Sequence, residues 1–342
     1  QDMTSGSPGR LIILFAIPLM LGNICQQLYT MVDTMVVGQI AGVEALAALG
    51  AVDFLMWVVT GISTGLTQGF SIQLSQYYGA KDFENLRKSL AHSYRLTAFI
   101  AVGVLILSQS FASLVLTGLH TPSNIIGMSL LYLRIIFCGI PATAAYNMFA
   151  SALRAMGNSK TPLTAMIIAS VLNVSLDILF VAGFGWGVAG AAIATVIAQS
   201  FSAVYCFLIL RRIDIVHLTK TDFMPASGMN ARLMKLGIPV VFQNIIIGVG
   251  GLVVQYVING YGFLFVAGFT ATNKLYGLLE MAAISYGYAI VTYVGQNLGA
   301  GKIDRIRKGV RSSMLLSLLT SLIISAAMFL FGKNILSLFI SG

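Results

Sequence analysis

Charged residues are scarce in this chain of 342 residues, where Asp, Glu, Lys and Arg make up 9% and hydrophobic residues 57%. A soluble domain carries about 25% charged residues, so the composition excludes an ordinary water-soluble domain. Cysteine is scarce as well, and Cys25, Cys138 and Cys206 all lie in apolar runs. Their spacing matches neither a disulfide framework nor a metal site, and we interpret them as small buried hydrophobic side chains.

Sequence motifs of membrane enzymes are also missing. The sequence holds no nucleotide-binding loop, no HxxxH pattern and no DxxD pattern. A membrane enzyme would need a metal cluster, an aspartate-rich diphosphate motif or a nucleophile with a base beside it. We therefore expect neither enzymatic activity nor a cofactor.

Long apolar runs dominate the sequence instead. A membrane-spanning helix needs about 20 apolar residues, and these continuous runs lack the short alternation of a transmembrane β-barrel. The sequence therefore predicts an all-α integral membrane protein with nine spans, which run roughly over 10–37, 46–77, 91–117, 125–152, 162–183, 187–210, 232–258, 264–294 and 310–331.

Lys and Arg, which give the chain a net charge of +9, gather in alternate connections between the spans. Seventeen of the twenty lie on one side, Lys333 lies on the other, and Arg134 and Lys274 lie within spans. An excess of basic residues marks cytoplasmic loops, so we expect a multi-pass protein of the cell (plasma or inner) membrane with a cytoplasmic N-terminus. Because topology accounts for the positive charge, we expect no nucleic-acid partner.

The chain contains an internal repeat. The segment "SQYYGAKDFENLRK" (75–88) aligns with "GQNLGAGKIDRIRK" (295–308), and "RLIILFAIP" (10–18) aligns with "RLMKLGIP" (232–239). The copies are about 220 residues apart with an even number of spans between them. This predicts parallel repeats related by an axis along the membrane normal, an architecture in which transporters bind substrate between the repeats.

We therefore predict a duplicated six-helix-bundle transporter with two lobes. The first lobe of six helices is 10–210, a cytoplasmic connector is 211–231, and the second lobe, 232–342, holds three of its six helices. Duplication predicts three more helices after Gly342, so we interpret the chain as truncated after its ninth helix. A natural nine-helix protein is the alternative.

Two aspartates lie inside the predicted spans. Asp33 precedes Gly38 by five residues and Asp177 precedes Gly183 by six, near the outer ends of their helices. At about 1.5 Å per residue, both carboxylates lie one to two turns below the outer surface. Ionisable groups inside a membrane bundle usually mark ion or proton paths. The alternative is a pair of hydrogen-bonded structural groups.

Other polar side chains share this depth. Asn173 is four residues before Asp177 and Gln26 is seven before Asp33, so each shares a helix face with its aspartate, and Thr195 is about two turns into its own helix. Two converging carboxylates can exchange a proton, or can join amide and hydroxyl oxygens in a site for a hard cation such as Na⁺. The sequence leaves both open.

Three stretches resemble the multidrug and toxic compound extrusion (MATE) family: "QQLYTMVDTMVVGQIAGVEALAALG" (26–50), "ALRAMGNSKTPL" (152–163) and "VGQNLGAGK" (294–302). The resemblance covers the whole chain and its duplication. It implies twelve helices in two six-helix lobes around a central V-shaped cavity. It also implies a monomer in membrane lipid that exchanges external H⁺ or Na⁺ for organic cations and other amphipathic compounds.

The DinF-like branch of that family is similar at four positions. Its helix 1 aspartate, its Asn and Asp four apart in helix 5 and its helix 6 threonine carry over to Asp33, Asn173, Asp177 and Thr195. The resemblance thus implies that these four are the cation-coupling residues and candidate Na⁺ ligands. That branch usually has proline after the helix 5 aspartate, whereas this chain has Ile178, which leaves the local helix geometry open.

Pro18 lies in the first span, two turns before Gln26. Proline removes a backbone hydrogen bond and favours a bend, which is either a static kink or a hinge. Our hypothesis is that neutralising Asp33 changes this bend and shrinks the first-lobe cavity, so that cation entry competes with drug release.

Four polar residues are candidates for lining the substrate cavity. Asp53 is either a cavity acid or a side chain wetted by the outward opening, and Asn147 and Gln199 either line the cavity or bond neighbouring helices. Gln26 is the fourth. Three further charged residues within spans carry no assigned role: Arg134, Lys274 and Glu280.

The leading hypothesis is a secondary antiporter that exports drugs or organic cations in exchange for H⁺ or Na⁺. One alternative is a flippase for lipid-linked precursors, a distant relative, and another is an inactive transporter fragment. A flippase of that class typically has a cationic cavity for a pyrophosphate. The first lobe here has carboxylates and, as its one clear internal base, Arg134, which disfavours the flippase.

Overall fold

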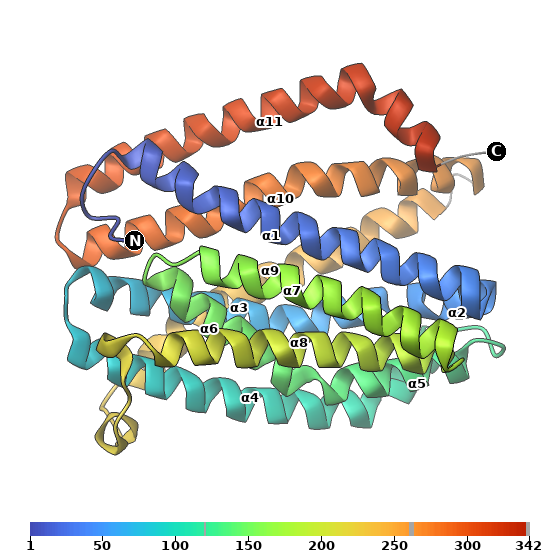
Figure 1. The fold of residues 1–342 in the computed structure, drawn as a ribbon, viewed down its shortest axis with the longest axis horizontal. Coiled ribbons are helices and arrows are strands. Elements are labelled where there is room, and N and C mark those ends of the chain that lie inside the picture. The colour runs from blue at the N-terminus through green and yellow to red at the C-terminus, as the bar shows by residue number, and fades with distance from the viewer. Residues whose placement is uncertain (120, 260–262, 340–342) are drawn as a thin grey trace.

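The computed structural model describes residues 1–119, 121–259 and 263–339, and within these ranges the chain is helical with no strand (Figure 1). A helix lies at each of the nine predicted positions. The elements in chain order are α1 (Pro8–Val36), η1 (Val37–Ala41), α2 (Val43–Gly50), α3 (Asp53–Gly79), α4 (Phe83–Gly118), α5 (Ile126–Cys138), α6 (Ile140–Ala155), α7 (Lys160–Asp177), η2 (Ile178–Gly183), α8 (Gly187–Arg211), η3 (Asp214–Val216), η4 (Lys220–Phe223), α9 (Met229–Asn259), α10 (Phe263–Gly299) and α11 (Ile303–Phe339).

Several of these helices are suited to a bilayer. Among the described residues, six helices are long and apolar enough to cross a membrane. The number of possible spans rises to eight if each of two bent helix pairs forms one span. The helix at the eighth predicted position, α10, is not in that count. The prediction of an all-helical, multi-pass membrane protein is confirmed.

Two of the spans predicted as continuous are broken. The span 46–77 divides into α2 and α3, bent by 40°, and the span 125–152 divides into α5 and α6, bent by 46°. Pro141 lies in the first turn of α6, where its missing N–H is tolerated and a new helix starts. Asp53 lies in the first turn of α3, where a carboxylate interacts favourably with the helix dipole.

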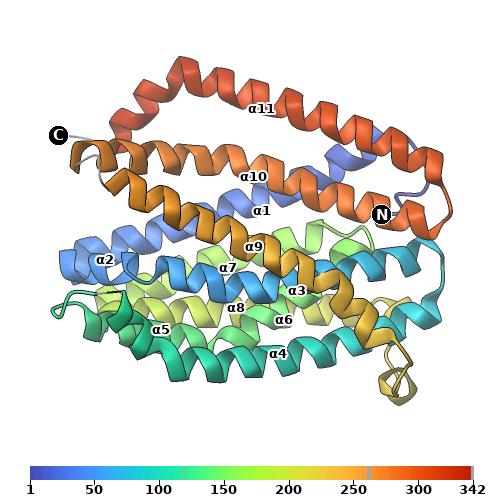
Figure 2. The same cartoon turned by 180° about the vertical axis from the view of Figure 1, so that it is seen from behind.

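Two helices cross between the halves of the bundle (Figures 1 and 2). Helix α9 packs along α3, and α1 packs against both α7 and α10. Helices α10 and α11 pair on one side, with α4, α5, α6 and α8 on the other. The α3–α9 packing requires glycine, because a Cβ on Gly69 would overlap the backbone of Gly237.

Buried side chains form three clusters that hold this arrangement. One joins α3, α4, α6 and α8 and includes Phe70 and Leu153. A second, towards the other end of the bundle, includes Phe137 and Val181. The third joins α1 to α10 and includes Phe15, Ala16, Tyr286 and Tyr293. Helix α1 therefore has apolar packing against α10 and also packs along α7.

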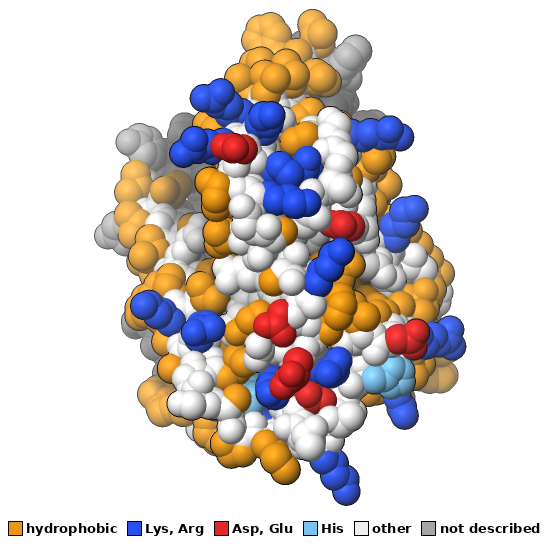
Figure 3. All heavy atoms as spheres, turned by 90° about the vertical axis from the view of Figure 1, so that its left-hand side faces the viewer, with side chains coloured by type: hydrophobic (Ala, Val, Ile, Leu, Met, Phe, Trp, Pro, Cys, Tyr) orange, Lys and Arg blue, Asp and Glu red, His pale blue; other side chains and the backbone are white. Residues whose placement is uncertain are grey.

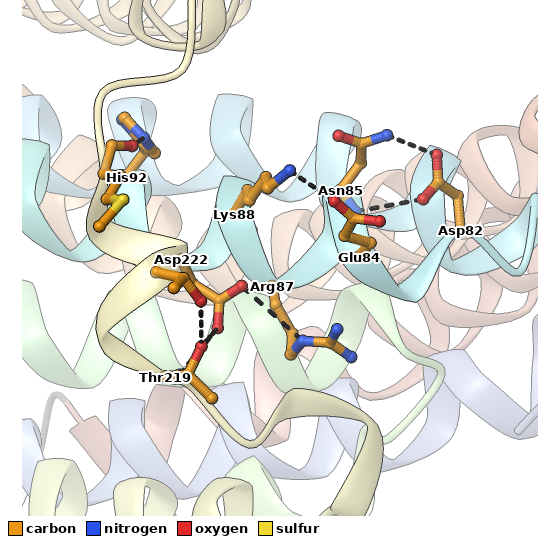
Figure 4. Close-up of polar contacts among 10 residues, drawn as sticks. Asp82, Glu84, Asn85, Arg87, Lys88, His92, Thr219 and Asp222 are labelled. Atoms are coloured by element: carbon orange, nitrogen blue, oxygen red, sulfur yellow. Dashed lines mark hydrogen bonds and ion pairs between the residues drawn. The ribbon is translucent and has the colours of Figure 1, made fainter.

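The predicted connector folds back onto α4 (Figure 4). Asp222 accepts hydrogen bonds from Thr219, N to Oδ2 at 2.7 Å, and lies 3.8 Å from Arg87 on α4. The ring of His92, buried on α4, lies 2.7 Å from Asn230 Oδ1 and 3.1 Å from Met224 O. These contacts hold the lead-in to α9 against the first lobe.

Lys and Arg gather at one end of the bundle, the end that carries the N-terminus and the α3–α4, α6–α7 and α10–α11 connections (Figures 1 and 3). This clustering agrees with the charge asymmetry of the sequence. That this end faces the cytoplasm stays a prediction. Exposed basic residues of these connections and the connector include Lys81, Arg211, Arg212, Lys220 and Lys302.

Candidate functional site

Asp33 and Asp177 lie at equivalent places in their helices. Asp33 is in the last turn of α1, Asp177 is the last residue of α7, and each helix continues into a π-helical turn, η1 and η2. These two turns contact each other, and π-helical turns are frequent at functional sites. Helix 1 thus runs past its predicted end at Gly38, to Ala41. Ile178 is the residue at which α7 changes to the π-helical turn.

The structure brings three of the four predicted coupling residues into one buried region. Asp33 is 6% exposed, Asn173 1% and Asp177 0%. The two carboxylates lie close enough to interact electrostatically. Asn173 Nδ2 donates to Thr195 Oγ1 at 3.4 Å, which joins the fourth residue to the group. We call Asp33, Asn173, Asp177 and Thr195 the carboxylate nest.

Several oxygens of the carboxylate nest are unsatisfied. Asp33 Oδ1, both Oδ atoms of Asp177 and Asn173 Oδ1 are buried and have no hydrogen-bond partner among the described residues. A buried carboxylate without a partner is costly, and two of like charge cost more unless a proton or a cation lies between them. The arrangement can therefore bind H⁺ or a cation that oxygen atoms coordinate.

Tyr132 on α5 is buried near the nest and was not predicted. It is 5% exposed and belongs to the apolar cluster that also holds Val37 and Val181, the residues of η1 and η2 that follow the two aspartates along the chain. A tyrosine in an apolar helix is normally read as packing, so the sequence "LYLR" around it gave no signal.

A central cavity of about 350 Å³ lies next to the carboxylate nest. Thr195 belongs to both, because it lines the cavity and accepts the hydrogen bond from Asn173. The other three nest residues do not line the cavity. Thr195 is therefore the direct contact between the two.

Three of the four predicted cavity residues line this cavity: Gln26, Asn147 and Gln199. Asp53 does not, and its side chain is exposed at the start of α3. The sequence predicts one span over 46–77, whereas the structure breaks it after Gly50, so that Asp53 begins a separate helix, α3. Whether the three lining residues contact substrate stays a prediction.

Other cavity residues were missed by the sequence analysis. Tyr29 lines the cavity beside the side chains of Gln26 and Gln199. Its signal was its position one turn before Asp33, on the same helix face. Tyr146 and Tyr288 also line the cavity, and no local pattern marks them.

Among the described residues, the basic side chain at the central cavity is that of Arg154, not Arg134. Arg134 is exposed on α5, whereas Arg154 lines the central cavity from the end of α6. The sequence instead places Arg154 in the basic connection between the spans predicted over 125–152 and 162–183. The last turn of α6, which carries Arg154, is packed inside the bundle, and its residues Leu153 and Ala155 are buried.

The remaining charged and hinge candidates have different outcomes. Pro18 lies inside α1, which stays helical through it, and it is buried at the edge of the cavity. Glu280 is exposed on α10. The Lys274 side chain lies outside the described residues. No group of three or more His, Cys, Asp or Glu side chains that could hold a metal occurs in the described part of the chain.

The chain is similar to one protein family and to several multidrug resistance proteins. The family model described as MatE matches residues 18–179 and 239–342. The probable multidrug resistance protein YpnP of Bacillus subtilis (strain 168) is 31% identical over 340 residues, which covers 99% of this chain and 76% of that protein. The probable multidrug resistance protein NorM of Thermotoga maritima is 26% identical over 337 residues, or 96% of this chain and 72% of that protein.

The fold also matches a solved structure. A MOP superfamily transporter from Pyrococcus furiosus superposes with a TM-score of 0.94 at 23% sequence identity, over 100% of this chain and 76% of that one. The chain therefore spans about three quarters of the length of these relatives. The three further helices predicted from the duplication stay a prediction.

Proposed function

The chain belongs to the MatE family, which makes it a multidrug efflux transporter and not an enzyme, and we propose that it works as a secondary antiporter. In this proposal amphipathic or organic-cation substrates leave through the central cavity. H⁺ or Na⁺ enters in exchange through the carboxylate nest of Asp33, Asn173, Asp177 and Thr195. The chain acts as a monomer in the cell membrane.

The observation that carries this proposal is the set of buried, unsatisfied oxygens on Asp33 and Asp177. A protein keeps such groups where an ion or proton binds in part of a cycle. The two acids would take up the ion as a coupled pair rather than as separate groups. The same four residues supply two carboxylates, an amide oxygen and a hydroxyl, the oxygen ligands that hard cations bind.

Coupling to the cavity follows from the position of Thr195. An ion bound between Asp33 and Asp177 changes the hydrogen bonding of Asn173, and through it the orientation of the Thr195 hydroxyl that faces the cavity. Helix α1 carries Asp33 at one end and Pro18 at the cavity, so neutralising Asp33 can also change the bend of α1. Ion entry and substrate release then compete.

Ethidium efflux from proteoliposomes under imposed H⁺ or Na⁺ gradients tests this function. We expect efflux from wild type with one of the two gradients, and its loss in Asp33→Asn and in Asp177→Asn. The matched control is Glu280→Gln, which neutralises an exposed acid on α10 and should transport like wild type. Equal gradient-driven efflux by wild type and both nest variants would disprove coupling through the nest.

The flippase alternative gains one observation. The sequence disfavours it because Arg134 is the one clear internal base of the first lobe, whereas the cavity itself is lined by Arg154. A cationic side chain in the cavity suits an anionic substrate. Transport of a fluorescent lipid diphosphate in the same proteoliposomes, without ethidium efflux, would favour the flippase.

A further inference from the structure

Arg154 is chemically unlike the rest of the central cavity. It lies in the last turn of α6, is partly buried, and is the only charged side chain among the described residues that line the cavity. This turn lies next to the α6–α7 connection at the basic end of the bundle, yet the side chain lines the cavity, and a charged group drawn away from water is usually paired. Arg154 therefore needs a partner that explains its position.

Its described contacts do not include an acid. Arg154 Nη2 donates to Ser151 Oγ at 3.0 Å, and the guanidinium lies 4.7 Å from the ring centroid of Tyr288 on α10. The ion pairs found among the described residues, Arg87 with Asp222 and Lys88 with Glu84, lie elsewhere. A guanidinium has five N–H donors in a planar fork, and one described hydrogen bond uses a single donor.

We propose that Arg154 binds the anionic group, a carboxylate or a phosphate, of an amphipathic substrate. The guanidinium fork matches both groups in a bidentate pair. Tyr146 lines the cavity near Arg154 and offers aromatic surface to the apolar part of the molecule. The cavity of about 350 Å³ is in the range of pockets for small organic ligands.

Tyr288 gives this site a means of release. It lies on α10 in the second lobe, whereas Arg154 lies on α6 in the first. The tyrosine ring and a bound anion compete for the same guanidinium, by a cation–π contact and by charge-assisted hydrogen bonds. Approach of α10 to α6 therefore favours the ring and displaces the anion.

The proposal rests on the proposed function only in taking the central cavity as the substrate site. It is tested by binding at equilibrium, without an ion gradient, so a failure of coupling through Asp33 leaves the result unaffected. The probes are dansylglycine, which carries a carboxylate, and dansylglycinamide, which is neutral and otherwise matched. Both are followed by dansyl fluorescence with the full chain in nanodiscs.

We expect wild type to bind dansylglycine about 10-fold or more tightly than dansylglycinamide. Arg154→Gln should weaken dansylglycine binding about 10- to 100-fold and change dansylglycinamide binding by less than about 2-fold. Arg154→Lys keeps the charge without the planar fork, so its affinity for dansylglycine should lie between those of wild type and Arg154→Gln. The matched control is Arg134→Gln, on the exposed face of α5, which should bind both probes like wild type.

Three competing ligands distinguish a lipid phosphate from a small soluble carboxylate. Displacement of dansylglycine by farnesyl phosphate but not by farnesol, lost in Arg154→Gln, assigns the anionic group to a lipid phosphate. Displacement by benzoate but not by farnesyl phosphate assigns it to a small soluble carboxylate. Both results support recognition of an anion at Arg154.

Tyr288→Leu distinguishes anion binding from a purely structural contact. If Arg154 binds the anion, this variant should bind dansylglycine at least as tightly as wild type, because it removes the competing ring. If Arg154 only holds α6 to α10, Tyr288→Leu and Arg154→Gln should each weaken the binding of dansylglycine and of dansylglycinamide by the same factor. That result would overturn the proposal. So would dansylglycine binding by Arg154→Gln as tight as that of wild type, or equal binding of dansylglycine and dansylglycinamide by wild type.

Discussion

Gly79 on α3 and Gly299 on α10 make the same contact in opposite directions. A Cβ on Gly79 would overlap the backbone oxygen of Gln296, and a Cβ on Gly299 would overlap the backbone oxygen of Gln76. Gly79 and Gly299 are 220 residues apart, as are Gln76 and Gln296. A contact that maps onto itself in this way is what a two-fold axis between parallel repeats produces. The two copies of the repeat therefore touch each other at their own equivalent residues.

Substituting either glycine should destabilise the protein. In Gly79→Ala and Gly299→Ala the new methyl meets backbone atoms, which cannot move aside like a flexible side chain, and overpacking of this kind typically costs about 1–3 kcal/mol. We expect a lower melting temperature in detergent and a smaller monodisperse fraction for both. Gly103→Ala on α4 is the matched control, because nothing lies within 4 Å of its Cβ, and alanine favours a helix. Equal melting temperatures for all three variants would contradict the close approach.

Gln296 should be needed to hold the N-terminal segment in place. Its Oε1 accepts from Met3 N at 2.9 Å and its Nε2 donates to Ala155 O at 2.8 Å, so one side chain joins α10 to the segment before α1 and to α6. Gln296→Leu leaves two buried backbone groups without a partner, at a cost of about 1–3 kcal/mol each. We expect faster hydrogen exchange in the peptide containing Met3, measured by mass spectrometry. Gln109→Leu, at a half-buried glutamine of α4 that donates to Arg134 O on α5 at 2.8 Å, removes a contact far from Met3 and should leave that peptide unchanged.

The carboxylate nest was predictable because its geometry is mostly local. Asn173 and Asp177 are one turn apart on α7, and depth below the helix ends placed Asp33 near them without knowledge of the fold. The helix positions were predictable for a similar reason, since an apolar run long enough to span a bilayer has few alternatives.

The features that the sequence did not reveal depend on contacts between distant segments. Arg154 and Arg134 each lie in an apolar helix, and only the packing of α6 against α3 and α8 places Arg154 at the cavity. The π-helical turns "VGQIA" and "ILFVAG" have no characteristic residues. The bend before Asp53 follows no proline, so nothing local in the sequence marks the break within the span predicted over 46–77.

The Thr195 hydroxyl should be required for coupling but not for binding. Thr195→Val keeps the shape of the side chain and removes the acceptor of the 3.4 Å bond from Asn173 Nδ2. We expect gradient-driven ethidium efflux to fall about 10-fold, the equivalent of one hydrogen bond, with ethidium affinity changed by less than about 2-fold. Thr195→Ser should retain efflux. Thr164→Val, at an exposed threonine of α7, is the control, and a loss of efflux there equal to that in Thr195→Val would refute the assignment.

The bend of α1 at Pro18 should respond to the charge on Asp33. Met35 lies 17 residues beyond Pro18, about 25 Å along the helix, so a change in bend of about 20° moves it by roughly 9 Å. Spin labels at Met35→Cys on α1 and Leu114→Cys on α4, both exposed positions, report this movement in a chain without its native cysteines.

We expect the distance distribution between these labels, measured by pulsed electron paramagnetic resonance, to shift by several Å when Asp33→Asn is added. The shift should be absent when Pro18→Ala is also present, because alanine restores the backbone N–H that lets α1 stay straight. Glu280→Gln, which removes an exposed charge far along the chain, should leave the distribution of wild type unchanged. Superimposable distributions for wild type and Asp33→Asn would mean that Pro18 forms a static kink, and that the carboxylate nest acts on the cavity through Asn173 and Thr195 alone.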